Sequence, residues 1–258
     1  MSVQPGLGTC EACKSYPTFF LQVLLGCLEG GLYVTTRIER ILSGLLTFAA
    51  LVIALVVVRR EFFAARPPVS RATLQLEYDS QWQGMLEQGI RMGAASAPLQ
   101  LIEFVDFECP VCRGFHRNTW PAIQKKFRDQ LALTVIHSPL SIHRFARIAA
   151  RAIECATSVG QGSQMMEVVF TKQDSLGLKS WPGYAAEAGV SDTVQFTRCV
   201  TASNRLARID SGLALFQRKG IRGTPTFFLN GWRFSIPPSD VEFARVADAL
   251  LAGRKPAL

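Results

Sequence analysis

The pattern of hydrophobic and polar positions predicts an apolar helix near the start of the chain and a mixed α/β region after it. Residues 41–58 carry no charged side chain and, as a helix of roughly 27 Å, are long enough to cross a membrane. Residues 99–107 form a nearly continuous apolar run, which is typical of a buried central strand. Residues 109–129 then show apolar side chains at helical spacing, and residues 131–140 predict a second strand.

The remainder of the chain is helical and then returns to strands. Residues 141–219 have a helical pattern that glycines and prolines divide into pieces. Two short strands follow, joined by Asn230-Gly231, a strong signal for a hairpin turn. A last helix should begin at Ser239 or Asp240 as its N-cap. The fold class is therefore α/β, with the order β-α-β, an all-helical insert, and β-β-α.

Four segments are expected along the chain. Residues 1–36 have no assigned role, residues 37–60 form a transmembrane anchor, residues 61–97 are a linker and lead-in, and residues 98–252 form the folded domain. With 258 residues, 48% hydrophobic and 19% charged, the chain is not disordered. Its net charge of +8 is spread without a dense basic run, so we expect no nucleic-acid partner.

The apolar helix is expected to remain uncleaved. No small-residue cleavage site follows it, because Arg59 and Arg60 come directly after it. A buried core helix is the alternative. The arginines after the helix outnumber Arg37 and Arg40 before it, and this bias by itself would keep the folded domain in the cytoplasm.

The cysteines of the first 36 residues leave several alternatives open. Cys10, Cys13 and Cys27 offer three metal ligands, but no nearby histidine or fourth cysteine completes a tetrahedral site. The sequence Leu-Leu-Gly-Cys ending at Cys27 loosely resembles a lipoprotein cleavage site, which the downstream anchor disfavours. In a third reading, translation begins near Val34. We assign this segment no function.

A Cys-Pro-Val-Cys motif lies where the first predicted strand gives way to a helix, with Cys109 and Cys112 three residues apart. A redox-active dithiol, a zinc half-site and two buried thiols are the alternatives. Zinc needs a second pair of ligands, and His116, His137 and His143 do not form one at metal-ligand spacing. We therefore favour the dithiol and expect neither a metal nor a cofactor.

Three stretches together resemble DsbA-like thiol-disulfide oxidoreductases of the thioredoxin superfamily. They are "EFVDFECPVC", the helix "HRFARIAARAIECA" and "GIRGTPTFFLNG", and the resemblance covers about residues 94–252. It implies a thioredoxin fold with an all-helical insert, here preceded by a single transmembrane helix. It also implies a protein thiol-disulfide oxidoreductase.

The chemistry of thiols gives each residue of the motif a role. At a helix N-terminus, backbone N–H groups and the helix dipole stabilise an exposed Cys109 thiolate and lower its pKa. Pro110 suits the first turn, because it has no N–H to lose there. Cys112, one turn further and more buried, should be the resolving thiol. Val111 stands where strongly oxidising relatives carry histidine, which indicates a milder oxidant.

The resemblance assigns two further parts of the site. Pro225 matches the superfamily's cis-proline, which would leave the Thr224 backbone free to pair with an extended substrate; a trans-proline at a strand edge is the alternative. Glu103 matches a buried acid beneath the dithiol. Desolvation would raise its pKa and suit it to exchange a proton with Cys112. The alternative for Glu103 is a strand residue held in a salt bridge.

Four residues keep open or structural roles. His116 is either structural or a tuning residue, and His143 is expected to cap or pack a helix. Cys155 and Cys199 are either separate buried thiols or a structural disulfide. As a disulfide, they would stabilise the helical insert by roughly 4 kcal/mol on the chain-entropy model.

Compartment and partners follow from the redox chemistry. Cytosolic thiols are already kept reduced, and large domains translocate with little regard to charge, so we expect the catalytic domain outside the cytoplasm. Residues 41–58 would hold it at a bacterial inner membrane. Client proteins with thiols or disulfides and a membrane redox partner are the expected partners. The expected activity is to oxidise or shuffle the disulfides of client proteins. One alternative is a reductant or isomerase, for example in cytochrome maturation. The other alternative is a non-enzymatic protein that binds a metal or clients.

Overall fold

The computed structural model describes residues 37–60 and 73–257 of the chain. The candidate metal ligands Cys10, Cys13 and Cys27 lie outside these ranges. The chain divides into two compact units, residues 1–70 and residues 71–258, and each unit is described by itself.

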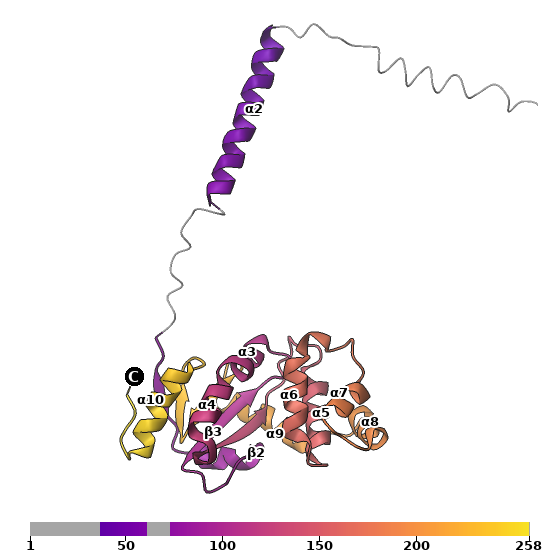
Figure 1. The fold of residues 1–258 in the computed structure, drawn as a ribbon, viewed down its shortest axis with the longest axis vertical. Helices are drawn as coiled ribbons and strands as arrows, with labels where there is room; N and C mark the ends of the chain where they lie inside the picture. Colours follow the sequence, from indigo (N-terminus) through magenta and orange to yellow (C-terminus); the bar gives the residue numbers. More distant parts are fainter. Residues whose placement is uncertain (1–36, 61–72, 258) are drawn as a thin grey trace, which may run out of the picture. The chain divides into compact units, whose positions relative to one another are not determined.

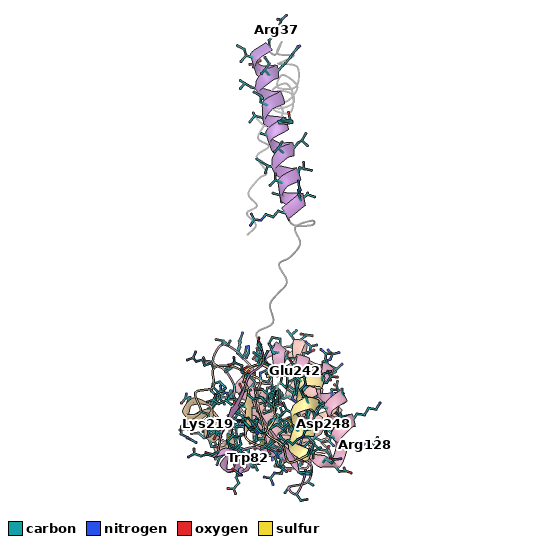
Figure 2. The ribbon with its side chains drawn as sticks, turned by 90° about the vertical axis from the view of Figure 1, so that its left-hand side faces the viewer. Arg37, Trp82, Arg128, Lys219, Glu242 and Asp248 are labelled. Carbon is teal, nitrogen blue, oxygen red and sulfur yellow. A yellow bond between two sulfur atoms is a disulfide. The ribbon has the colours of Figure 1, made fainter. Side chains whose placement is uncertain are left out.

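The first unit contains the predicted apolar helix, α2 (Arg37–Val58). It has 22 residues and a mean hydropathy of 2.8 over its most apolar window, so it is long enough and apolar enough to cross a membrane. None of its residues is buried, and Figure 2 shows its side chains projecting outward along its whole length.

The second unit is built on a six-stranded sheet with the order β1-β6-β5-β3-β4-β2 (Figure 1). Strands β3 (Leu99–Val105) and β4 (Leu131–His137) pair in parallel, as the predicted β-α-β unit requires. Strand β5 (Thr226–Leu229) pairs antiparallel with β3, and β6 (Trp232–Phe234) pairs antiparallel with β5. From β3 onward, the predicted order of β-α-β, a helical block and β-β-α is confirmed.

Two short strands come from the segment that the sequence predicted to be only a linker and lead-in. Strand β1 (Leu76–Tyr78) pairs with β6, and β2 (Ile90–Met92) pairs with β4, at opposite edges of the sheet. A 3-10 helix, η3 (Trp82–Gln88), connects them. Strands of three residues are too short for a period-two pattern, and pairing with the existing sheet is what defines them.

The predicted helix over residues 109–129 is in fact two helices, α3 (Pro110–Asn118) and α4 (Trp120–Phe127), which meet at Thr119. Pro121 explains the break. It has no N–H to donate to the carbonyl four residues earlier, and its ring crowds that carbonyl. The first of the two helices therefore carries the dithiol as a short, separate segment.

The block between β4 and β5 is helical, as predicted. It consists of α5 (Ala146–Thr157), α6 (Gly162–Thr171), α7 (Trp181–Glu187), α8 (Thr193–Thr201) and α9 (Ala207–Arg218), with the 3-10 turn η5 (Gln173–Ser175); a further turn, η4 (Arg128–Gln130), precedes β4. A disulfide joins Cys155 of α5 to Cys199 of α8, with the two Cα atoms 6.0 Å apart.

Both faces of the central strand are covered. Leu101 lies in the hydrophobic cluster that includes side chains of α3, α4 and α10 (Asp240–Leu251), whereas Ile102 lies in the cluster that includes side chains of α9 and η3. Because side chains alternate along a strand, Glu103 shares the face of Leu101. The acid of this strand therefore lies on the side covered by α3.

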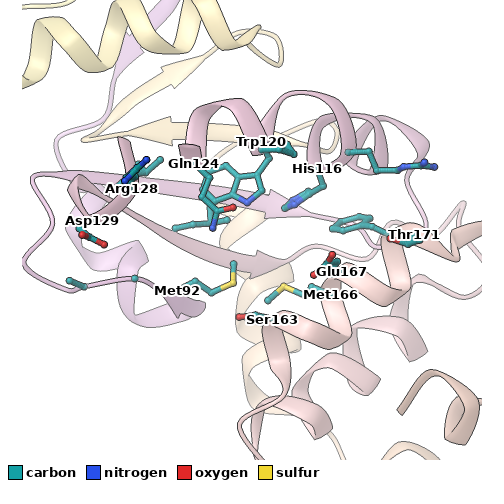
Figure 3. Close-up of a pocket in the computed structure, with 17 residues that line it drawn as sticks. Met92, His116, Trp120, Gln124, Arg128, Asp129, Ser163, Met166, Glu167 and Thr171 are labelled. Carbon is teal, nitrogen blue, oxygen red and sulfur yellow. The ribbon is translucent and has the colours of Figure 1, made fainter. Parts of the chain in front are cut away.

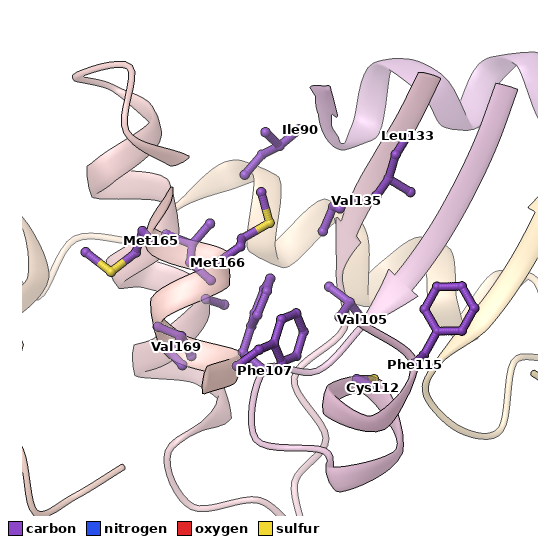
Figure 4. Packing of buried hydrophobic residues seen from close by; sticks show 14 of the residues in the cluster. Ile90, Val105, Phe107, Cys112, Phe115, Leu133, Val135, Met165, Met166 and Val169 are labelled. Atoms are coloured by element: carbon purple, nitrogen blue, oxygen red, sulfur yellow. The ribbon is translucent and has the colours of Figure 1, made fainter. Parts of the chain in front are cut away.

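The helical block packs against the end of the sheet where the dithiol lies. Figure 4 shows Met166 and Val169 of α6 close to Phe107, which follows β3. Cys112 belongs to the same hydrophobic cluster. The site is thus enclosed by the sheet and by the insert together.

The turn and the last helix form as predicted. Asn230 and Gly231 both have positive φ angles, 47° and 87°, which a two-residue hairpin with the twist of its strands requires. Ser239 is the N-cap of α10 and forms a capping box with Glu242.

Candidate active site at Cys109 and Cys112

Cys109 is the N-cap of α3, and Pro110 occupies the first turn, as expected. Both Cys109 and Cys112 are free thiols. Cys112 has no exposed surface, and Cys109 is only 5% exposed. The prediction of an openly exposed Cys109 is therefore wrong, because the loop that contains Thr224 packs against its sulfur; Cys109 is nevertheless the more accessible of the two cysteines.

The two thiols are driven to opposite protonation states. The pKa of Cys109 is lowered from 9.0 to about 5. The largest cause is the hydrogen bond from the Cys112 side chain. Together with hydrogen bonds from backbone N–H groups and from the Thr224 hydroxyl, it outweighs burial, which raises the pKa. Burial, then the hydrogen bond with the Cys109 side chain, and then the charges of Glu103 and Cys109 raise the pKa of Cys112 well above its ordinary value. At neutral pH the pair is one thiolate and one thiol.

The loop before β5 forms the opposite side of the site. The peptide bond between Thr224 and Pro225 is cis. The Sγ atom of Cys109 lies 3.3 Å from the carbonyl oxygen of Thr224. The Thr224 hydroxyl is buried, and in the described part of the chain it has no hydrogen-bond partner other than the Cys109 sulfur. The cis bond therefore lies in the loop that contacts the sulfur of Cys109.

Glu103 lies beneath α3 and is completely buried. Its Oε2 atom is 2.8 Å from Nε2 of His116. His116 follows Cys112 by one helical turn, so the two side chains project from the same side of α3. The role of His116 was open in the sequence; in the structure it is the hydrogen-bonding partner of the buried acid.

Asp106 organises the turn between β3 and α3, although no sequence pattern distinguished it. One carboxylate oxygen accepts the N–H of Glu108 at 2.8 Å. The other accepts the N–H of Leu140 at 2.7 Å and lies 2.7 Å from Nδ1 of His143. His143 was expected to cap or pack a helix, but the structure pairs it with Asp106 beside the dithiol.

This pairing favours the charged form of His143 near Cys109. Burial disfavours the charged imidazolium of His143, but the hydrogen bond and charge of Asp106, together with the charge of Cys109, outweigh burial and raise its pKa above the ordinary value. Val111 supplies no charge from within the motif. The group whose charged form is favoured near Cys109 is instead His143, at the start of the insert and 37 residues after Asp106.

Gln173 is a second contribution of the insert that the sequence did not reveal. It is buried, and its Nε2 atom donates hydrogen bonds to the carbonyl oxygens of Phe107, at 2.9 Å, and Cys109, at 3.1 Å. These bonds attach the active-site loop to the helical block. A single glutamine in a turn has no sequence signature that could have identified it.

A thiolate at a helix N-terminus, a buried partner thiol and an adjacent cis-proline loop can carry out thiol-disulfide exchange. Among residues 37–60 and 73–257, no group of three His, Cys, Asp or Glu side chains is placed to hold a metal ion. The fold and the site define a protein of the thioredoxin class.

The chain belongs to the thioredoxin family, whose family model matches residues 86–249. Its fold is similar to that of oxidised BdbD from Bacillus subtilis, with a TM-score of 0.59 and 20% identity, covering 65% of this chain and 95% of BdbD. It is also similar to alpha-DsbA1 from Wolbachia pipientis, with a TM-score of 0.54 and 23% identity, covering 63% and 90%. The predicted DsbA-like thioredoxin fold is confirmed.

A different kind of relative matches part of the chain. The Na⁺/H⁺ antiporter NhaA of Herminiimonas arsenicoxydans is 36% identical over 141 residues, which are 55% of this chain and 22% of that protein. This chain thus spans less than a quarter of its relative. A match of 141 residues is too long to lie entirely before residue 86, so it extends into the thioredoxin region.

Proposed function

We propose that the protein is a thiol-disulfide oxidoreductase that oxidises or shuffles disulfides of client proteins through Cys109 and Cys112. The observation that carries this proposal is the placement of Cys109 at the N-terminus of α3 and against the carbonyl of Thr224, which favours opposite ionisation of the two thiols. A thiolate is the species that attacks a disulfide and the better leaving group from one. The DsbA-like fold supports the same reading.

Oxidation of a client proceeds in two exchanges. A client thiolate attacks Sγ of Cys109 in the oxidised enzyme, the bond to Cys112 breaks, and Cys112 leaves with an electron pair and takes up a proton. The second client thiolate then attacks the client sulfur of the mixed disulfide. The client disulfide forms, Cys109 leaves as a thiolate, and two electrons have passed from client to enzyme.

The low pKa of Cys109 favours this direction, because a stabilised thiolate makes the reduced enzyme the preferred product. A reductant or isomerase, for example in cytochrome maturation, would use the same steps in reverse, and a reduction potential distinguishes the two directions. A protein that only binds metal or clients would not need two thiols with such different pKa values.

Thr224 and Pro225 form the proposed binding site for the client. The Thr224 backbone lies next to the attacking sulfur, where an extended client segment could pair with it as an added strand. Val111 is 53% exposed and offers apolar contact beside the dithiol. Glu103, whose charge acts on Cys112, is the proposed proton donor and acceptor for that thiol.

The proposed location is a bacterial inner membrane, with α2 as anchor and residues 70–258 on the outer side. An oxidising compartment gives a dithiol oxidant a use, and the disulfide between Cys155 and Cys199 suits such a compartment. Each oxidation leaves the enzyme reduced. A membrane redox partner that removes these electrons therefore belongs to the proposal.

Trapping of clients tests the function. Cys112→Ser should accumulate mixed disulfides with clients in cells, because Cys109 can still attack and nothing resolves the product. Cys109→Ser should trap few or none. High-mass adducts on non-reducing gels that vanish with reductant are the measurement; stronger trapping by Cys109→Ser would reverse the assignment of the nucleophile. Equilibration with glutathione buffers then gives the direction: a potential near about −120 mV indicates an oxidant and one near about −270 mV a reductant.

A further inference from the structure

A cavity of about 830 Å³ lies between α3 and α4 on one side and α6 on the other. Figure 3 shows His116 and Trp120 reaching toward it from the first side, and Met166 and Glu167 facing them from α6. The dithiol does not line this cavity. His116 is the residue that connects it to the acid beneath the dithiol.

Glu103 is isolated from water. Its side chain has no exposed surface, and both faces of its strand are covered. One carboxylate oxygen, Oε1, is buried without a hydrogen-bond partner in the described part of the chain. A buried polar atom without a partner costs free energy and calls for an explanation. A carboxyl group that changes its protonation here needs a route to solvent.

His116 is placed to be that route. Its Nε2 atom lies 2.8 Å from Oε2 of Glu103, while its side chain is 12% exposed and lines the cavity. The ring is stacked on Phe170, with ring centres 4.4 Å apart and an interplanar angle of 19°, which holds its orientation. Nδ1 has no hydrogen-bond partner among residues 37–60 and 73–257.

We propose that His116 relays protons between Glu103 and water in this cavity, so that the cavity is the proton exit of the buried dithiol. The inference rests on the proposed function. His116 touches the acid and not the sulfur atoms, so it is a positioning and relay residue and not a catalytic one.

The steps balance over one cycle. When a client thiolate attacks Cys109, the departing Cys112 takes a proton from protonated Glu103. Cavity water then adds a proton to Nδ1 of His116, and the proton on Nε2 passes to Glu103. When the enzyme is reoxidised, Glu103 first passes its proton to Nε2 and Nδ1 releases one to water, and the Glu103 carboxylate then takes the proton of Cys112. The imidazole is thereby reset to its starting tautomer.

The experiment measures how fast the full chain, in detergent micelles, is reduced by dithiothreitol and reoxidised by glutathione disulfide between pH 5 and pH 9. His116→Ala should slow both reactions about 100-fold at neutral pH, the usual scale of acid-base assistance. Added imidazole should restore the rate, because the truncated side chain leaves space that opens to the cavity. His116→Gln keeps a hydrogen-bonding group but fills the space, so it should be slow and insensitive to imidazole.

Gln124→Ala is the matched control. This exposed side chain lines the same cavity, and its removal should leave both rates and their response to imidazole at the wild-type level. In the double variant His116→Ala/Glu103→Gln, imidazole should have no effect, because the relay has lost its acceptor.

Two outcomes would overturn the relay: wild-type rates for His116→Ala at every pH, or a slow His116→Ala that imidazole does not restore. The second outcome would make His116 a packing residue for Phe170. Failure of the proposed function looks different, since the wild-type chain itself would then exchange its disulfide with neither reagent.

Discussion

The sulfur of Cys109 lies 3.3 Å from the carbonyl oxygen of Thr224, a residue 115 positions later in the chain. Cys109, the proposed nucleophile, and the proposed client-binding loop therefore become neighbours only when α3 and the segment before β5 meet. The hydroxyl of Thr224 is also among the groups that lower the pKa of Cys109. The low pKa is consequently a property of the folded site and not of the motif alone.

The first prediction concerns the thiolate itself. Alkylation of the reduced chain by iodoacetamide should rise with pH to a plateau, with its midpoint near a pH of about 5. Cys112→Ala should move this midpoint upward, because the hydrogen bond from Cys112 is the largest cause of the low pKa. Cys112→Ser, which keeps a hydroxyl donor, should move it less. Identical midpoints in both variants would contradict this explanation.

The second prediction concerns Thr224. Thr224→Val keeps the shape of the side chain and removes the hydroxyl, so the alkylation midpoint of Cys109 should rise. Thr224→Ser keeps the hydroxyl and serves as the control, with a midpoint near that of the wild type. Rates must be compared in the reduced protein, since the oxidised protein has no thiolate to accept the hydrogen bond. A midpoint in Thr224→Val that matches the wild type would remove the hydroxyl from the explanation.

The third prediction concerns His143 and pH. Its pKa is raised in the folded protein, so its contribution to stability is fully present below the unfolded pKa near 6.5 and disappears as pH rises through the folded pKa. His143→Asn should therefore lower the urea midpoint of the reduced chain more at pH 6 than at pH 9, followed by tryptophan fluorescence.

The oxidised chain is the control for this third prediction. Without the thiolate of Cys109, one of the charges that favour the imidazolium is absent. The loss of urea midpoint caused by His143→Asn should then differ less between pH 6 and pH 9. An equal difference in the oxidised and reduced chains would show that the carboxylates of Asp106 and Glu108, and not the Cys109 thiolate, act on His143.

The fourth prediction concerns the disulfide between α5 and α8. Replacing both Cys155 and Cys199 by alanine should lower the free energy of unfolding by about 4 kcal/mol, on the entropy model for a loop of about 45 residues. The measurement is urea unfolding of the oxidised chain. Each single variant should lower the free energy of unfolding about as much as the double variant, because losing either sulfur breaks the bond. If the effects of the two single variants added up to that of the double variant, the two thiols would be unpaired.

The fifth prediction concerns topology. Alkaline phosphatase fused after Leu258 should be active in a bacterial host, because it folds only outside the cytoplasm, and a cytoplasmic fluorescent reporter at the same position should be dark. The arginines that follow α2 argue for the opposite orientation. A bright cytoplasmic fusion would move the folded domain inside and leave the proposed clients out of reach.

The parts of this protein that could be predicted from its sequence are those encoded over short distances. Periodicity identified β3, β4, the helical insert and α10, and the dipeptide Asn230-Gly231 identified the hairpin. Cys109 and Cys112 were recognised because a strand, a proline and two thiols follow one another directly. The break at Thr119 also has a local cause, Pro121, although periodicity alone predicted one helix over residues 109–129.

Tertiary structure decided which side chains meet. Nothing in the local pattern pairs Asp106 with His143, Glu103 with His116, or Gln173 with the carbonyl of Cys109. Each pair joins separate elements, and its geometry depends on how α3 and the insert pack against the sheet. Periodicity reports which face of an element is buried but not which partner buries it. The sequence alone therefore determined the Cys-Pro-Val-Cys motif and its fold, whereas the packed domain decided the charges, the hydrogen bonds and the buried acid that surround the two cysteines.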